Sequence, residues 1–540
     1  MIIRSFAFVI IYVIGSHTSF AQKPNVIFIL ADDLGWGDLQ CYGNPYIETP
    51  AINRLAAEGL RFTDYYSPSP LCAPARAALL SGRFNHRTGA IDVSSNRGID
   101  RIALSELTMG DYFKHAGYAT ALIGKWHNGL YNEAYLPYNR GFDLFYGFLN
   151  GGQDYYKYNL MRNGIYEKND GRYMTDVFNQ EAIKFIEQHK DEPFFIFLSH
   201  HAPHPPFQAP DSLIRKYTQR IGKRYTAQAA IMYAMIEVMD RGIGDMIDKL
   251  EDLKLRENTV IIFTSDNGAY YSSKEIPRFH GPFSGEKGNV LEQGIRVPAI
   301  ISWKGKIAAG KIINTPVHGC DWLPTLYSLT GTKPPENAKA LDGINLMPLL
   351  KGMEMPDLAN RKLFFQKNRY APVAHSDGSL RTGPWKLYWP MIDGTMKKDI
   401  ARDNPSYEKG LIHKHWEMPL DTELPSYETM NSRAPQLFNL TEDPSERYDV
   451  AEKHPELVKE MIKSYDVWFE NIMIDWSRSW TEIKKEDQVY WRKKHAPDPI
   501  ELYEGFWRWD VSGLDSTAAN PLEVFKGYWS GKRLETNYKK

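Results

Sequence analysis

The chain has few cysteines, almost no net charge and no long apolar run. Its 540 residues include only Cys41, Cys72 and Cys320, too few for a disulfide scaffold and without the paired spacing of a zinc site. Lys and Arg total 65 and Asp and Glu total 66, so a net charge of -1 excludes a global basic field for nucleic acid. Any anionic ligand must therefore be held locally.

The N-terminal residues predict export. Arg4 precedes an apolar run over residues 6–14, and Ser19 and Ala21 are small residues at the positions that a signal peptidase reads. This run is about half the ~20 apolar residues that a spanning helix requires. We therefore expect a cleaved signal peptide over residues 1–21, no membrane anchor, and a secreted or periplasmic protein.

The remaining length predicts more than one domain, because single cores stop growing near ~250 to 300 residues. Short β-branched or aromatic runs alternate with helical stretches, which is typical of an α/β fold with a large mixed, mostly parallel sheet between helices. After about residue 370 the pattern changes to hairpin strands and one amphipathic helix over residues 455–469, which predicts a smaller C-terminal α+β domain. The expected units are a catalytic domain (24–370), the α+β domain (371–470) and a Trp-rich extension without clear periodicity that wraps the body (471–540).

Four apolar runs carry the functional prediction. The runs cover residues 26–30, 119–123, 194–198 and 260–264. Polar side chains follow them, in the same order, at residues 32–33, 125–127, 200–204 and 266–267. Continuous apolar runs are typical of strands buried on both faces, and ligands bind beyond the carboxyl ends of such strands. We expect helices over residues 49–58, 73–82, 104–116, 174–189 and 224–250 to cover the sheet.

Two of these strand ends predict a metal site. Asp32, Asp33, Asp266 and Asn267 offer only oxygen ligands, which a hard divalent cation such as calcium prefers. A single Asp-Asp pair is more often a helix start or a turn, but two such groups at equivalent strand ends favour a metal.

Cys72 is the third candidate group. Pro74 favours a helix start, so Cys72 should lie at a helix N-terminus, where free amide groups attract an anion and lower a thiol pKa. The alternative is an inert buried cysteine. Ser67, Pro68, Ser69 and Pro70 predict an exposed or mobile approach to it.

These motifs resemble those of a known family. Cys72-Ala-Pro-Ala-Arg76 is similar to the C-x-P-x-R signature of formylglycine-dependent sulfatases, although Ala75 stands where that family usually has serine. Later family motifs resemble Gly124-Lys-Trp-His127, Ala202-Pro-His204, Ser265-Asp-Asn-Gly268, Gly285-Glu-Lys287 and the segment 292–298, in the same order. The resemblance extends over roughly residues 24–470 and implies an alkaline-phosphatase-like fold.

The resemblance also implies roles for these residues. A maturation enzyme would convert Cys72 to formylglycine, whose hydrated form attacks sulfur beside one Ca²⁺ bound by residue 72 and the ligands Asp32, Asp33, Asp266 and Asn267. Arg76 would hold a hydroxyl or the carboxylates, and Lys125 and Lys287 would bind the sulfate oxygens. His204 would protonate the leaving oxygen and also contact substrate, while His127 would accept the proton of the second hydroxyl. Lys125 and His127, at i and i+2 of an extended segment, would point the same way.

Simpler interpretations remain open for several of these residues. Taken singly, the two lysines are ordinary surface residues, and His200 or His201 could satisfy loop backbone groups. His280 and Trp126 either line the substrate pocket or pack. The tyrosines of segment 151–158 either form a carbohydrate subsite or pack a loop.

The resulting prediction is a sulfatase that acts on a sulfated carbohydrate, such as algal ulvan, carrageenan or fucan, or a glycosaminoglycan. One alternative is a phosphate or phosphonate ester hydrolase of the same superfold, although such enzymes typically use two transition metals and a Ser or Thr nucleophile. The other is a non-catalytic protein that binds sulfated glycans, if Cys72 is never oxidised.

Overall fold

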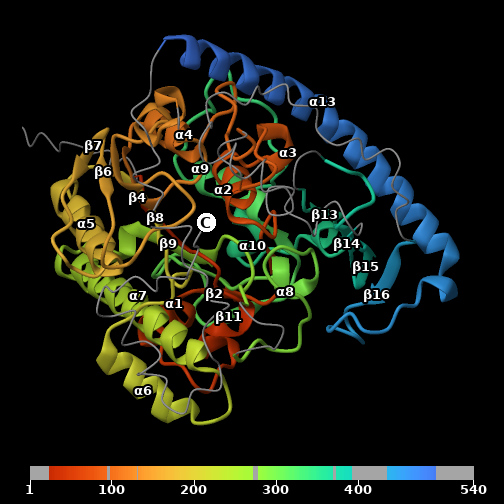
Figure 1. The fold of residues 1–540 in the computed structure, drawn as a ribbon, viewed down its shortest axis with the longest axis horizontal. Coiled ribbons are helices and arrows are strands. Elements are labelled where there is room, and N and C mark those ends of the chain that lie inside the picture. Colours follow the sequence, from red (N-terminus) through yellow and green to blue (C-terminus); the bar gives the residue numbers. More distant parts are fainter. Residues whose placement is uncertain are drawn as a thin grey trace, which may run out of the picture.

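A ten-stranded mixed sheet forms the centre of the molecule (Figure 1). The computed structural model describes residues 23–93, 98–130, 132–271, 278–368, 372–391 and 434–493. The strand order is β11-β2-β10-β9-β1-β8-β4-β5-β6-β7. Their bounds are β1 Asn25–Ala31, β2 Leu60–Phe62, β4 Ala119–Lys125, β5 Leu144–Phe148, β6 Leu160–Arg162, β7 Ile165–Glu167, β8 Phe194–Ser199, β9 Thr259–Ser265, β10 Ala299–Ser302 and β11 Lys311–Ile313.

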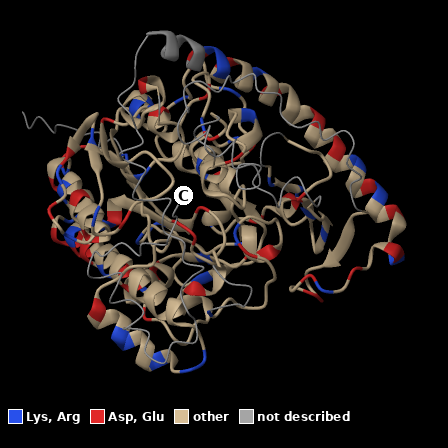
Figure 2. Cartoon of the chain, viewed as in Figure 1, with Lys and Arg blue, Asp and Glu red and all other residues tan. Residues whose placement is uncertain are grey.

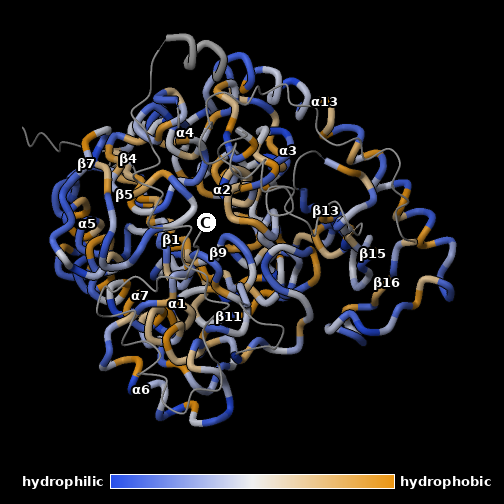
Figure 3. Tube along the Cα trace, in the orientation of Figure 1, coloured by the Kyte–Doolittle hydropathy of each residue, from blue (hydrophilic) through white to orange (hydrophobic). Residues whose placement is uncertain are grey.

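The middle of this sheet is parallel, as the sequence predicts. β9, β1, β8, β4 and β5 run in one direction, whereas β10 and β6 pair antiparallel with their inner neighbours. The four predicted apolar runs form β1, β4, β8 and β9. Figure 3 shows hydrophobic residues along the strands of this sheet. The residues of the four runs are almost all fully buried because helices cover both faces of the sheet.

Alternate residues of each strand enter two different cores. In β1, Ile27 and Ile29 face one core, while Val26 and Phe28 face the other. The first core is closed by α1 Pro50–Glu58, α5 Met174–Gln188, α6 Asp211–Ile221 and α7 Ala227–Asp252. The second core is closed by α2 Cys72–Ser81, α4 Met109–His115, α9 Trp322–Ser328 and α10 Met347–Leu350.

The helix predictions hold apart from their ends. The helix predicted over residues 104–116 begins at Met109, because the Thr108 side chain accepts a hydrogen bond from the Asp111 backbone and Asp111 accepts one from Thr108. Acidic and basic residues are mixed along the outer helices, which is consistent with a balanced net charge (Figure 2).

A second, antiparallel sheet forms the smaller C-terminal domain. Its order is β13-β14-β15-β16, with bounds Leu363–Gln366, Gly378–Thr382, Trp385–Trp389 and Gln436–Asn439. Two short strands, β3 Tyr65–Tyr66 and β12 Val317–His318, pair separately from both sheets. Two short helices are α3 Asn85–Thr88 and α8 Glu292–Ile295. The small sheet therefore begins slightly before residue 371.

The last helix is much longer than predicted. α13 spans Pro455–Lys493 and runs along the outside of the molecule from the small sheet to α3 (Figure 1). The prediction that it ends at residue 469 and that the chain then loses periodicity is wrong for residues 470–493. Ile472, Ser479 and Ile483 are buried at helical spacing, and Ser479 donates to the Arg87 backbone at 2.6 Å.

Two predictions fall outside the described residues. These are the signal peptide over residues 1–21 and the part of the Trp-rich extension beyond residue 493. Within the described segments, every helix is too short or too polar to span a bilayer.

Candidate active site

The carboxyl ends of four parallel strands meet at one edge of the large sheet. The register pairs Leu30 of β1 with Ser199 of β8 and Thr264 of β9, and Gly124 of β4 with the same Ser199. The polar residues that follow these strands are thus brought to one place, as predicted.

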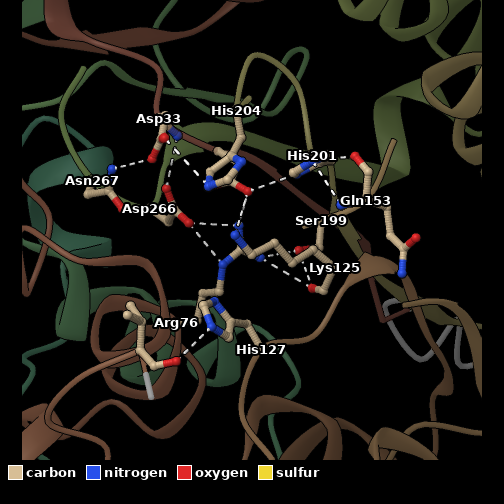
Figure 4. Close-up of polar contacts among 12 residues, drawn as sticks. Asp33, Arg76, Lys125, His127, Gln153, Ser199, His201, His204, Asp266 and Asn267 are labelled. Atoms are coloured by element: carbon tan, nitrogen blue, oxygen red, sulfur yellow. Dashed lines mark hydrogen bonds and ion pairs between the residues drawn. The ribbon is translucent and has the colours of Figure 1, made fainter. Parts of the chain in front are cut away.

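Three buried carboxylates form the centre of the site. Oxygen atoms of Asp32, Asp33 and Asp266 lie within 4.8 Å of one another, and the Asn267 amide donates to Asp33 Oδ1 at 2.7 Å (Figure 4). Burial and the neighbouring Asp32 raise the pKa of Asp266 to about 7. Burial alone would also raise the pKa of Asp32, but the adjacent Lys125 and two histidines hold it well below its usual range.

The donor set fits a hard divalent cation. Among the described residues, Asp32 Oδ1, Asp33 Oδ2 and Asn267 Oδ1 are buried oxygens without a hydrogen-bond donor. Buried polar atoms are normally paired, so these oxygens have unused capacity to bind a cation. All of them are oxygen ligands, which calcium accepts readily.

Arg76 links α2, the helix that begins at Cys72, to these carboxylates. Its side chain, only 1% exposed, contacts Asp266 Oδ2 through Nε at 2.9 Å and through a terminal nitrogen at 2.7 Å. The other terminal nitrogen donates to the Lys125 carbonyl at 3.2 Å and to the Ser199 hydroxyl. Of the two roles considered for Arg76, its contacts match the one in which it holds the carboxylates.

Two lysines add positive charge on either side of the cluster. Lys125 Nζ lies 2.6 Å from Asp32 Oδ2, and Lys287 Nζ lies 2.6 Å from Asp33 Oδ1. Lys125 is fully buried and Lys287 nearly so, which excludes the interpretation that they are ordinary surface lysines. The two lysines and Arg76 thus provide three positive charges, which balance the three carboxylates.

Cys72 begins α2, as predicted, but its surroundings differ from the prediction. The residue is 3% exposed and the preceding segment is buried, so the expected exposed or mobile approach is wrong. Burial raises the pKa of the Cys72 thiol, although Lys125 and Lys287 act in the opposite direction. The prediction of a lowered thiol pKa is therefore also wrong, because desolvation outweighs the helix N-terminus and the lysines.

Two histidines approach the cluster from different strands. His204 Nε2 lies 3.8 Å from Asp33 Oδ2, and its Nδ1 lies 2.6 Å from the Pro205 carbonyl. His127 Nε2 lies 3.4 Å from the Val93 carbonyl, and among described residues its Nδ1 has no hydrogen-bond partner. Burial lowers the pKa of both histidines well below the usual value.

The predicted extended segment through His127 is not present. β4 ends at Lys125, and His127 has a left-handed backbone with φ of 60°. Lys125 and His127 therefore do not follow the strand alternation that the sequence predicts, although both reach the site.

Two residues that the sequence left without a role are part of the site. His201 places Nδ1 3.2 Å from Asp32 Oδ2 and Nε2 3.1 Å from the Gln153 carbonyl, so it does more than satisfy a loop. Ser199 donates to the Lys125 carbonyl at 2.6 Å and accepts from Arg76. Their positions at the end of β8 were the available signal.

The remaining predicted substrate residues differ in their surroundings. His280 is half-buried, with its backbone against Gly37, and none of its described contacts is with the carboxylate cluster. Trp126 is buried in the second core. In the tyrosine-rich segment, Tyr155 is buried, stacks on His201 at 4.9 Å between ring centroids and donates to the His204 carbonyl, which is a packing role.

Several known proteins are similar to this chain in both sequence and fold. The family model described as Sulfatase matches residues 24–332. N-acetylgalactosamine-6-sulfatase of Canis lupus familiaris is 34% identical over 465 residues, covering 80% of this chain and 82% of that protein. Human arylsulfatase A is 32% identical over 464 residues, covering 80% and 84%.

A solved structure gives the same result. Ps i-CgsB in complex with k-i-k-neocarrahexaose superposes with a TM-score of 0.69 at 28% identity, covering 89% of this chain and 100% of that chain. Together with the matched family model and the relatives above 30% identity, this shows that the chain belongs to the sulfatase family and is a sulfuric ester hydrolase.

Proposed function

We propose that this protein hydrolyses sulfate esters of a sulfated carbohydrate, with formylglycine at position 72 and one calcium ion. The observation that carries the proposal is the convergence of Cys72, three buried carboxylates and two buried lysines at one sheet edge. The similar proteins include an N-acetylgalactosamine-6-sulfatase and Ps i-CgsB in complex with k-i-k-neocarrahexaose, so glycosaminoglycan and carrageenan fragments are the first substrates to test.

Asp32, Asp33, Asp266 and Asn267 would hold the calcium ion, consistent with their unpaired buried oxygens. Bound there, calcium supplies positive charge that stabilises an oxygen nucleophile and the sulfate oxygens. Hydrated formylglycine supplies that nucleophile, and a maturation enzyme would be the partner that forms it. Arg76 fixes the orientation of Asp266 from the same helix that carries residue 72.

The chain's own side chains bind the sulfate and move the protons. Lys125 and Lys287 hold the sulfate oxygens, where negative charge shifts as the ester bond breaks. His204 gives a proton to the leaving sugar oxygen, and a bound anionic sulfate favours its protonated form. His127 is neutral because burial lowers its pKa, and its open Nδ1 accepts the proton in the second half of the reaction.

The proposal includes export through the signal peptide of residues 1–21, to a secreted or periplasmic location. Sulfated polysaccharides are large and occur outside cells, so an exported enzyme meets them directly. His280 stays a predicted substrate contact.

A desulfation screen tests the proposal. The full chain, co-expressed with a formylglycine-generating enzyme, is incubated with carrageenan, ulvan, fucan and glycosaminoglycan oligosaccharides, and released sulfate is measured. Cys72→Ala should abolish release, and Lys287→Ala or His204→Ala should reduce it strongly. Cys320→Ala, which changes another buried cysteine, is the matched control and should retain activity.

Three outcomes would count against the proposal. Equal sulfate release from Cys72→Ala would exclude the nucleophile, and mass spectrometry that finds an unmodified thiol at residue 72 beside bound but intact glycan would favour a glycan-binding protein. Faster hydrolysis of phosphate monoesters or phosphonate esters in a parallel assay would favour the other enzyme class.

A further inference from the structure

The loop that carries Lys287 lies between the active site and the small antiparallel sheet. On the side of the site, the Lys287 amide donates to the Ala269 carbonyl at 2.8 Å, and the Gly288 amide donates to the Pro70 carbonyl at 2.9 Å. Ala269 follows the metal-site residue Asn267, and Pro70 precedes Cys72. The loop backbone therefore joins the metal side of the site to the nucleophile side.

On its other side, the loop is held by Asp377 of the small domain. Asp377 Oδ1 accepts a hydrogen bond from the Val290 amide at 3.3 Å, three residues after Lys287. Ser379 of β14 donates to the Val290 carbonyl at 3.5 Å, so both backbone groups of one loop residue bond to the same strand region. Asp377 is 1% exposed, so these hydrogen bonds are shielded from solvent.

The end of the loop is held by Glu446, also from the small domain. Glu446 Oε2 accepts a hydrogen bond from the Glu292 amide at 2.7 Å, at the start of α8. Lys386 of β15 lies between the two carboxylates, 2.8 Å from Glu446 and 2.9 Å from Glu292, and all three side chains are fully buried. Nearby, Ser284 donates to the Ser445 carbonyl at 2.6 Å, which fixes the beginning of the loop.

The backbone conformation of these anchors is unusual. Within the described chain, six non-glycine residues have a positive φ, and they include Asp377 at 42° and Glu446 at 53°. Two others are Asp33 and His127 of the site itself. Left-handed backbone in a glutamate is unfavourable and persists only where the surrounding structure fixes it, and such residues cluster at functional sites.

Stability alone does not account for this arrangement. Buried ion pairs are often replaceable by apolar residues without loss of stability, because desolvation offsets their attraction. Their advantage is that charged hydrogen bonds fix a geometry. Here the charged hydrogen bonds fix the position of the loop backbone, and this position places the Lys287 ammonium 2.6 Å from Asp33.

We propose that Asp377 and Glu446 of the small domain are positioning residues for Lys287. They hold the backbone of residues 284–292 so that Lys287 reaches the sulfate position. The small domain therefore contributes to the geometry of the active site. The inference rests on the proposed function, in which Lys287 binds the sulfate group.

A double-mutant cycle tests this inference. Asp377→Ala and Glu446→Ala are each made in the wild-type and in the Lys287→Ala background, and kcat/KM is measured on the oligosaccharide selected by the screen. In the wild-type background each should lower kcat/KM about 10- to 100-fold, the usual result of a small misplacement in a site. In the Lys287→Ala background each should have an effect of less than about 3-fold, since the residue that they position is gone.

Conservative variants and a remote control separate positioning from folding. Asp377→Asn and Glu446→Gln keep a hydrogen-bond acceptor and should recover most of the activity. Asp240→Ala is the matched control, because Asp240 is also a buried carboxylate that accepts two backbone hydrogen bonds, at the start of α1. Its effect should add to that of Lys287→Ala, and circular dichroism should show that all variants are folded.

A second readout does not need turnover. The affinity for inorganic sulfate, measured by calorimetry, should weaken in Asp377→Ala and Glu446→Ala, with no further weakening when Lys287→Ala is added. If wild-type protein releases no sulfate, the proposed function fails, yet this binding arm still judges the positioning role. Additive effects in either assay, or alanine and amide variants that are equally impaired, would overturn the inference, as would wild-type protein that does not bind sulfate.

Discussion

Removal of the Arg76 guanidinium is predicted to destabilise the protein strongly. Arg76 makes two contacts with Asp266 Oδ2, at 2.9 and 2.7 Å, and both side chains are at most 1% exposed. Arg76→Met keeps most of the aliphatic volume but leaves the Asp266 carboxylate without its main counter-ion. Breaking a buried ion pair in this way costs up to about 3 to 5 kcal/mol, because the Asp266 carboxylate must either stay buried without its counter-ion or take up a proton.

The prediction is checked by equilibrium urea unfolding in the presence of a chelator, so that no metal ion replaces the missing cation. Arg172→Met is the control, since Arg172 contacts Asp170 at a similar 2.6 Å with both side chains about half exposed. Solvent screens the charges of an exposed pair, so the control should lose little stability.

The double variant Arg76→Met with Asp266→Asn tests the cause. It removes both charges and should be more stable than the sum of the single effects predicts, by a coupling free energy of about 1 to 3 kcal/mol. If Arg76→Met loses no more stability than Arg172→Met, or if the two site substitutions are additive, the argument from buried charge is refuted.

Three further predictions follow from the same geometry. Gly124→Ala should lower the free energy of unfolding by about 2 to 5 kcal/mol in the same urea assay, because φ is 109° and a Cβ would lie 1.9 Å from the Ser199 carbonyl oxygen. Gly117→Ala is the control, since its φ is 77° but an added Cβ would meet no atom within 4 Å; it should lose only about 1 to 2 kcal/mol. Burial and Glu292 raise the pKa of Glu446 to about 7, so the folded protein holds a proton on Glu446 that the unfolded chain releases near pH 4.5. The free energy of unfolding should therefore fall by about 3 kcal/mol or less between pH 4.5 and 7. In Glu446→Gln the urea midpoint should depend less on pH over that range, and an unchanged pH dependence would contradict the assignment. Calcium at 100 times its Kd should stabilise the protein by about 2.7 kcal/mol in thermal unfolding, and Asp33→Asn should abolish most of the shift; equal shifts in both proteins would exclude this metal site.

The strand ends were predictable because their cause is local. A parallel strand that is buried on both faces requires a continuous apolar run, and the polar residues after it must lie at the carboxyl edge. Asp33 and Asp266 could therefore be placed together from sequence although 233 positions separate them. The same argument located Lys125 and the histidines after β8.

Features that depend on contacts between distant segments were not predictable. The length of α13 depends on packing against residues 83–89, where Asp475 pairs with Arg83 and Arg87, and nothing in the local sequence shows which surface faces the helix. The raised thiol pKa of Cys72 depends on burial, which the polar and proline-rich approach to it did not indicate. The roles of His201 and Ser199 required knowledge of which atoms lie within hydrogen-bond distance.

The balance of charge in the site explains how a chain of nearly zero net charge can select an anion. Arg76, Lys125 and Lys287 offset the three carboxylates, so one divalent cation would leave the site with a charge of about +2 in a buried environment where charges interact strongly. A sulfate ester would restore part of that balance, whereas a neutral sugar would not. Because the attraction arises within the site and not over the surface, selectivity depends on how accurately the three cations are held, which is the task that Arg76, the end of β4 and the small domain share.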